Sequence, residues 1–146
     1  MITSPIAVVD AGLAVFAVLQ TSQSEFADRT WNRLQQEGTS IYVPRLWRHE
    51  VTSVIHKYLF EGLLEPELGE KILSLTLELV ENVVDEDPEL CRAAFRWANR
   101  LNQKPAYDGF YLAVAEALEA QFWTADRKLA NNAQSKGVHW VHWFGE

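Results

Sequence analysis

Two aspartates stand where a short apolar run ends and a segment of helical periodicity begins. Asp10 directly follows the run at 6–9, and Asp126 follows the run at 121–124 after one alanine. An aspartate in this position can cap the next helix, because its side-chain oxygen accepts a hydrogen bond from a free amide of the first turn. It can equally serve a chemical site at the end of a strand. For each aspartate taken alone, both interpretations stay open.

A third acid, Glu50, lies inside a predicted helix, where no capping role is available. Leu46 and Val54 flank it at four-residue spacing, so its carboxylate leaves the apolar face of that helix. A buried glutamate is rare unless it is paired. The partner is either an arginine, Arg45 or Arg48, or a metal ion.

The fourth acid, Asp108, opens a further helical segment. Helical spacing aligns it with Tyr111, Leu112 and Ala115, which form the stripe that should face a sheet. Its carboxylate therefore points toward the interior or toward a cleft at the edge of the interior.

The four acids together indicate a cation site. Carboxylates gathered without matching cations repel one another and take up protons, unless a divalent ion neutralises them. Hard oxygen ligands, with no cysteine and no clustered histidine, favour Mg²⁺ or Mn²⁺ over Zn²⁺. Such a site typically hydrolyses phosphodiester bonds, because its ions orient a water and stabilise a charged transition state. The basic residues near the acids, which are candidates for contacting substrate phosphate, are Arg45, Arg48, Arg127 and Lys128.

Short apolar runs alternate along the chain with longer segments of helical period, which is typical of a βα protein with a mainly parallel sheet. In such sheets ligands bind outside the carboxyl ends of the strands, where the strand order reverses. The predicted strands are 6–9, 40–43, 82–85, 121–124 and 138–142. The predicted helices are 11–20, 24–37, 45–61, 66–80, 89–101, 108–119 and 126–135.

Composition limits the class of protein. A chain of 146 residues with 48% hydrophobic residues and no low-complexity segment predicts one globular domain over 1–146. The formal net charge of −7 argues against bulk attraction to nucleic acid, so basic side chains or metal ions must hold such a substrate. The single cysteine, Cys91, excludes an intramolecular disulfide, favours a cytoplasmic location and is expected in the core. The apolar run at 6–19 lacks a basic leader, contains Asp10 and is too short to span a bilayer, so no membrane segment is expected.

Four segments resemble, in order and spacing, the motifs of PIN-domain ribonucleases, and the closest likeness is to VapC-type toxins of toxin–antitoxin pairs. They are VVDA at 8–11, VPRLWRHEV at 43–51, YDGFYLAVA at 107–115 and TADR at 124–127. The resemblance implies an α/β/α sandwich around a parallel sheet and an endoribonuclease that leaves a 5′-phosphate and a 3′-hydroxyl. It implies that the four acids surround Mg²⁺ or Mn²⁺ and that Thr124 supports them with its hydroxyl. It further implies an RNA substrate, a homodimer and inhibition by a small antitoxin whose C-terminal segment lies in a groove of the toxin.

One position departs from the family pattern. Gly12 stands two residues after Asp10, where the family usually has Ser or Thr, and its backbone amide is a candidate replacement for the missing hydroxyl. The departure keeps a second hypothesis open, in which the chain is a PIN-like binding module that sequesters RNA or a protein without turnover. A phosphoacceptor receiver ranks below both, because Asp10 has no acidic neighbour.

Overall fold

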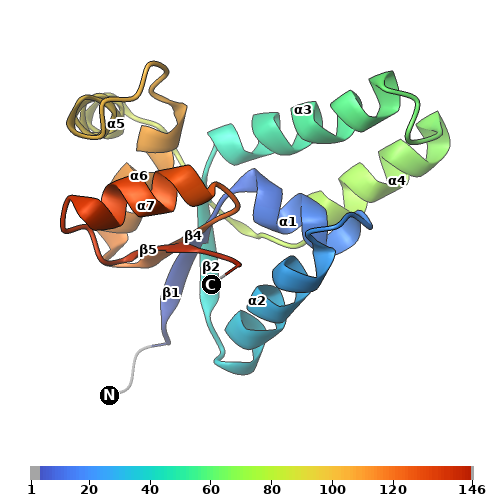
Figure 1. Ribbon diagram of the computed structural model, residues 1–146, viewed down its shortest axis with the longest axis horizontal. Coiled ribbons are helices and arrows are strands. Elements are labelled where there is room, and N and C mark those ends of the chain that lie inside the picture. The colour runs from blue at the N-terminus through green and yellow to red at the C-terminus, as the bar shows by residue number, and fades with distance from the viewer. Residues whose placement is uncertain (1–3, 146) are drawn as a thin grey trace.

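The computed structural model describes residues 4–145 and contains one sheet of parallel strands with helices on both faces (Figure 1). The predicted single domain over 1–146 includes residues 1–3 and 146, which lie outside the described residues, and this domain assignment stays a prediction. The strands are β1 (Ile6–Val9), β2 (Ser40–Pro44), β3 (Asn82–Val84), β4 (Gln121–Thr124) and β5 (Val141–Trp143). The last strand begins later than predicted, because residues 139 and 140 form a turn.

The helices follow the predicted segments closely. Their bounds are α1 (Ala11–Val18), α2 (Ser24–Gln36), α3 (Leu46–Phe60), α4 (Pro66–Leu77), α5 (Pro88–Arg100), α6 (Tyr107–Leu118) and α7 (Arg127–Ser135). Helices α1 to α4 lie on one side of the sheet and α5 to α7 on the other (Figure 1). The predicted α/β/α sandwich is therefore confirmed.

The strand order is β3-β2-β1-β4-β5, with every pairing parallel. Crossovers between parallel strands are right-handed, so the chain places helices on one face while it moves from β1 to β3. It places helices on the other face after it returns to β4 beside β1. The order therefore reverses between β1 and β4, and the crevice outside their carboxyl ends is where such sheets bind ligands.

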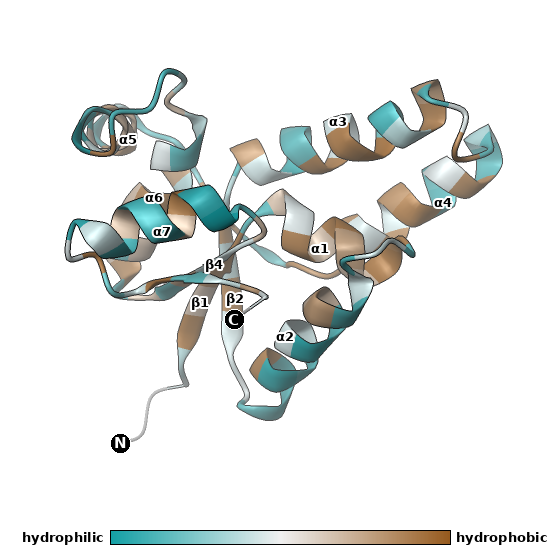
Figure 2. Cartoon of the chain, in the orientation of Figure 1, coloured by the Kyte–Doolittle hydropathy of each residue, from teal (hydrophilic) through white to brown (hydrophobic). Residues whose placement is uncertain are grey.

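The sheet is buried on both faces, which explains why its strands are nearly continuous apolar runs. Val8 and Val9 of β1 and Phe122 of β4 are fully buried, and helix α6 packs across β1, β2 and β4. Figure 2 shows hydrophobic residues concentrated along β1 and β2, whereas α7 is mostly hydrophilic. The centre of the sheet is thus a rigid base for the residues that follow β1 and β4.

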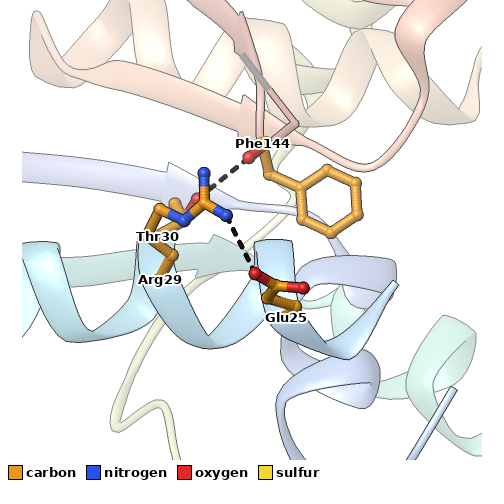
Figure 3. Close-up of polar contacts among 4 residues, drawn as sticks. All are labelled: Glu25, Arg29, Thr30 and Phe144. Atoms are coloured by element: carbon orange, nitrogen blue, oxygen red, sulfur yellow. Dashed lines mark hydrogen bonds and ion pairs between the residues drawn. The ribbon is translucent and has the colours of Figure 1, made fainter. Parts of the chain in front are cut away.

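Three contacts fix the surroundings of this edge. A Cβ on Gly109 would lie 2.3 Å from the carbonyl oxygen of Ala94, so the glycine lets α6 press against the backbone of α5. Thr30 of α2 donates a 3.2 Å hydrogen bond to the carbonyl of Phe144, as Figure 3 shows. The Phe144 amide donates in turn to the carbonyl of Thr124, at 3.0 Å. Helix α2 therefore helps to hold the end of β4 through the segment after β5.

Cys91 is not in the core. It lies on the exposed side of α5, and its Sγ is 3.9 Å from the carbonyl of Glu86. The prediction was wrong because α5 buries Ala94, Trp97 and neighbours on one stripe, and Cys91 falls outside that stripe.

None of the helices within residues 4–145 combines the length and the apolar character needed to cross a bilayer.

Candidate functional site

Asp10 leaves the carboxyl end of β1 and is held by both of its oxygens. Oδ1 accepts from the amide of Leu13 at 2.9 Å, which caps α1. Oδ2 accepts from the hydroxyl of Thr124 at 2.6 Å and from the amide of Ala125 at 2.8 Å. The capping interpretation is thus confirmed, but it accounts for only one of the two oxygens. The other oxygen binds the neighbouring strand end.

Thr124 relays between two of the acids. Its fully buried hydroxyl donates to Asp10 and accepts, through the same oxygen, from the backbone amide of Asp126 at 2.9 Å. A hydroxyl suits this position because it has one proton to donate and lone pairs left to accept. The register of β1 on β4 pairs Val9 with Trp123, so the residues after each strand meet directly.

Asp126 is exposed and caps α7, with Oδ1 accepting from the amide of Leu129 at 3.1 Å. Its other oxygen, Oδ2, forms no hydrogen bond among the described residues. Both aspartates at strand ends therefore serve as helix caps and also stand beside each other.

Glu50 lies in the second turn of α3, half-buried between Trp47 and Val51 of the core face. Its Oε1 accepts a short hydrogen bond from the hydroxyl of Tyr111, and among residues 4–145 it forms no ion pair. Arg45 pairs instead with Asp85 at 2.8 Å, on the exposed surface. The arginine alternative for Glu50 is therefore wrong.

Asp108 lies in the first turn of α6 and is half-buried. Its Oδ2 accepts from the side-chain amide of Gln103 at 3.3 Å, and Oδ1 has no hydrogen bond in the described structure. The predicted direction of this carboxylate, toward the edge of the interior, is consistent with its interactions with the other acids.

The electrostatics join the four acids into one group. Burial, together with repulsion from Asp126 and Asp10, raises the pKa of Asp108 to about 6. Burial also raises the pKa of Glu50, with repulsion from Asp108 and Asp10 adding to it. Burial raises the pKa of Asp10 and outweighs the three hydrogen bonds that lower it, and repulsion from Asp126 raises it as well. In the described part of the chain no basic side chain lowers the pKa of any of these three carboxyls, so the group favours a cation.

The four carboxylates lie near one another but do not surround one common position for an ion. Within residues 4–145, no three His, Cys, Asp or Glu side chains are arranged to hold a metal ion between them. Three of the four acids nevertheless keep one oxygen free of hydrogen bonds: Glu50 Oε2, Asp108 Oδ1 and Asp126 Oδ2. The donor set consists of hard oxygens, which in its chemistry fits Mg²⁺ or Mn²⁺.

Gly12 is explained by packing. A Cβ at this position would lie 2.8 Å from the Cβ of Ala125, closer than real side chains approach. A serine or threonine would push α1 away from the end of β4. The backbone amide that contacts Asp10 is that of Leu13, and the suggested replacement of the missing hydroxyl by the Gly12 amide stays a prediction.

The basic candidates do not form a single patch. The guanidinium of Arg127 lies 4.9 Å from the ring centre of Trp143, and Arg45 is engaged with Asp85. Arg48 and Lys128 are exposed and form no ion pair in the described part of the chain.

Three polar side chains at this edge were not predicted from the sequence. Tyr111 binds Glu50, Gln103 binds Asp108, and Glu86 Oε2 accepts from the amide of Leu46 at 2.9 Å at the start of α3. A signal existed for Tyr111 alone, because a tyrosine on an inward-facing stripe needs a partner for its hydroxyl. The other two come from loops whose course the sequence pattern does not reveal.

Solved structures share this fold. PAE2754 from Pyrobaculum aerophilum is 20% identical, with a TM-score of 0.69 over 98% of this chain and 92% of that one. VapC20 of Mycobacterium tuberculosis, described as a sarcin-ricin loop cleaving toxin, is 13% identical, with a TM-score of 0.61 over 82% and 87%. VapBC2 from Rickettsia felis, solved with a promoter DNA fragment, is 16% identical, with a TM-score of 0.64 over 94% and 96%.

A search of curated proteins by sequence gave no match. The family model of the PIN domain, in contrast, matches residues 7–134 and so spans all four acids. The resemblance expected from the motifs at 8–11, 43–51, 107–115 and 124–127 is confirmed. With that match covering most of its length and the parallel sheet in place, this chain belongs to the PIN domain family.

Proposed function

We propose that this chain is a divalent-metal-dependent endoribonuclease that hydrolyses RNA phosphodiester bonds and acts as the toxin of a type II toxin–antitoxin pair. One observation carries the proposal. Four acids from the ends of β1 and β4 and from α3 and α6 lie near the point where the strand order reverses, and none of them forms an ion pair within residues 4–145. Membership of the PIN domain family supports nuclease chemistry at that point.

The residues proposed to hold Mg²⁺ or Mn²⁺ are Asp10, Glu50, Asp108 and Asp126, and Thr124 supports the first and last of these through its hydroxyl. When bound, such an ion activates a water and stabilises charge on the phosphate. A divalent cation would offset the mutual repulsion that raises the pKa of Asp10, Glu50 and Asp108.

The chain's own groups have separable tasks in this proposal. The amide of Ala125 and the hydroxyl of Thr124 orient Asp10, so that its carboxylate faces the crevice with little freedom. The capping hydrogen bond from the Leu129 amide fixes Asp126 at the start of α7. Tyr111 holds one oxygen of Glu50, and Gln103 holds one oxygen of Asp108. Precise orientation of ligands in advance of binding is what such a site needs for affinity and rate.

We also propose a small antitoxin as partner, a homodimer and a cytoplasmic location. VapC20 and VapBC2 show that chains of this fold occur as toxins and in toxin–antitoxin complexes. Large apolar side chains at the end of the α3–α4 hairpin suit a protein partner, since Phe60 and Leu63 are 82% and 64% exposed.

Cleavage by the purified chain, freed of any antitoxin, tests the enzyme proposal. We expect cutting of RNA with Mg²⁺ or Mn²⁺, none with EDTA and none with Asp10→Asn. The matched control is Asp87→Asn, because Asp87 caps α5 through the Leu90 amide at 2.8 Å but lies outside the four acids. Cleavage that survives EDTA or Asp10→Asn would falsify the proposal.

The second candidate is a PIN-like module that binds RNA or a protein without turnover. Its support is that, within residues 4–145, no three acidic, histidine or cysteine side chains are arranged to hold an ion between them. A Mn²⁺ titration separates the two candidates: a binding module shows no Mn²⁺ binding that depends on Asp10, whereas the enzyme does.

A further inference from the structure

The hydroxyl of Tyr111 links α6 to the metal-site candidate on α3. Tyr111 is 1% exposed, and its ring stacks on Phe122 of β4, with centroids 5.5 Å apart and planes 7° from parallel. Its hydroxyl donates to Oε1 of Glu50, across 61 residues of sequence. The ring is thus clamped in the core while its polar end reaches the crevice.

We propose that Tyr111 is a positioning residue, which orients Glu50 so that Oε2 is presented to a divalent cation. This inference rests on the proposed function and adds a residue to it. A phenol has a single proton to donate, so it can engage only one oxygen of a carboxylate. The other oxygen, Oε2, then has no hydrogen bond among the described residues, and the carboxyl group as a whole is repelled by Asp108 and Asp10.

Glu50, like Asp108, is held by a single side-chain hydrogen bond, whereas Asp10 depends less on any one of its contacts. Asp10 accepts from three donors, and Asp126 is held as the cap of α7. Glu50 has a longer side chain and, within residues 4–145, this one hydrogen bond. Without it the side chain regains rotamers that point Oε2 elsewhere, and cation binding must restrict them again.

The test substitutes Tyr111→Phe, which keeps the stacked ring and removes the hydroxyl. The control is Tyr58→Phe, on the same helix as Glu50, where the hydroxyl has no partner among the described residues. Electron paramagnetic resonance measures Mn²⁺ binding, and circular dichroism checks folding. We expect the Mn²⁺ dissociation constant of Tyr111→Phe to rise about tenfold, as for other residues that orient ligands. We expect Tyr58→Phe to match the parent.

Kinetics add a readout that simple loss of stability does not move. Tyr111→Phe should lower kcat for RNA cleavage with KM for RNA unchanged, and excess Mn²⁺ should restore most of the loss. A folded Tyr111→Phe with the Mn²⁺ affinity of the parent overturns the inference.

Glu50→Gln provides a second comparison, which tests the route by which Tyr111 acts. In the Glu50→Gln background, adding Tyr111→Phe should leave Mn²⁺ affinity unchanged, because the role of the tyrosine passes through the carboxylate. A further drop there shows that Tyr111 acts by another route and overturns the inference. If the parent chain neither binds Mn²⁺ through Asp10 nor cuts RNA, the proposed function fails and this inference fails with it. If only the Tyr111 prediction fails, the function stands.

Discussion

The hydroxyl of Thr124 donates a 2.6 Å hydrogen bond to Oδ2 of Asp10 and so joins the ends of β4 and β1, the two strands between which the sheet order reverses. The same oxygen accepts from the amide of Asp126. One buried threonine therefore sets the distance between two of the four acids.

Thr124→Val keeps the shape of the side chain but removes the hydroxyl. We expect a loss of about 1–3 kcal/mol in the free energy of unfolding, because a buried acceptor and a backbone amide both lose their partner. We expect Mn²⁺ affinity and RNA cleavage to fall as well. The control is Thr76→Val: Thr76 is equally buried, but its hydroxyl bonds the carbonyl of Ile72 in its own helix. Equal effects of the two variants on Mn²⁺ affinity would contradict the role given to Thr124.

Gly12→Ser restores the residue type usual in the family, and we expect it to destabilise this chain. The new Cβ would meet Ala125 at 2.8 Å, and such crowding in a packed interior costs about 1–3 kcal/mol. Adding Ala125→Gly removes the opposing methyl group and should recover most of the loss. Urea unfolding of the two single variants and the double variant measures this. Additive losses in the double variant would show that the two positions do not touch.

The raised pKa of Asp108 predicts how the free energy of unfolding depends on pH when no metal is bound. Its pKa rises from 3.8 to about 6 in the fold, so the folded state resists ionisation that the unfolded chain undergoes freely. The metal-free fold should therefore lose stability as pH rises from about 4 to 6, by on the order of 1–3 kcal/mol. Asp108→Asn removes this penalty.

Urea unfolding in EDTA at pH 5 and pH 7.5 measures the difference between the parent and Asp108→Asn. We expect the free energy of unfolding of Asp108→Asn, relative to that of the parent, to be higher at pH 7.5 than at pH 5. We also expect this variant to lose RNA cleavage. A stability difference that is the same at both pH values contradicts the cause given for the raised pKa.

Addition of Mn²⁺ should stabilise the folded chain. A ligand that binds only the folded state at a hundred times its dissociation constant adds about 2.7 kcal/mol. Thermal unfolding with and without Mn²⁺ should show this shift for the parent and for Asp87→Asn, and little or none for Asp10→Asn. The same shift in Asp10→Asn would place the bound ion away from the four acids.

The sequence pattern predicted the central elements well and the periphery less well. The predicted strands 6–9 and 121–124 match β1 and β4. Short apolar runs of this kind suit a strand in the middle of a parallel sheet, where both faces are covered. The strand predicted at 138–142 begins instead at Val141, since an apolar run beside a glycine also suits a turn. Cys91 was predicted in the core because cysteine is usually buried. It is exposed because it lies outside the buried stripe of α5.

The sequence by itself determined the acids, their order and their positions at strand ends or on inward-facing helical stripes, because hydrophobic periodicity is a local property. Only the tertiary structure decided what each acid binds. Thr124 and Asp10, 114 residues apart, meet through the register of β1 on β4, and Tyr111 reaches Glu50 from another helix. Gly12 shows the same division: its type departs from the motif, and the reason is the close approach of Ala125, which depends on how α1 packs and not on the residues beside it.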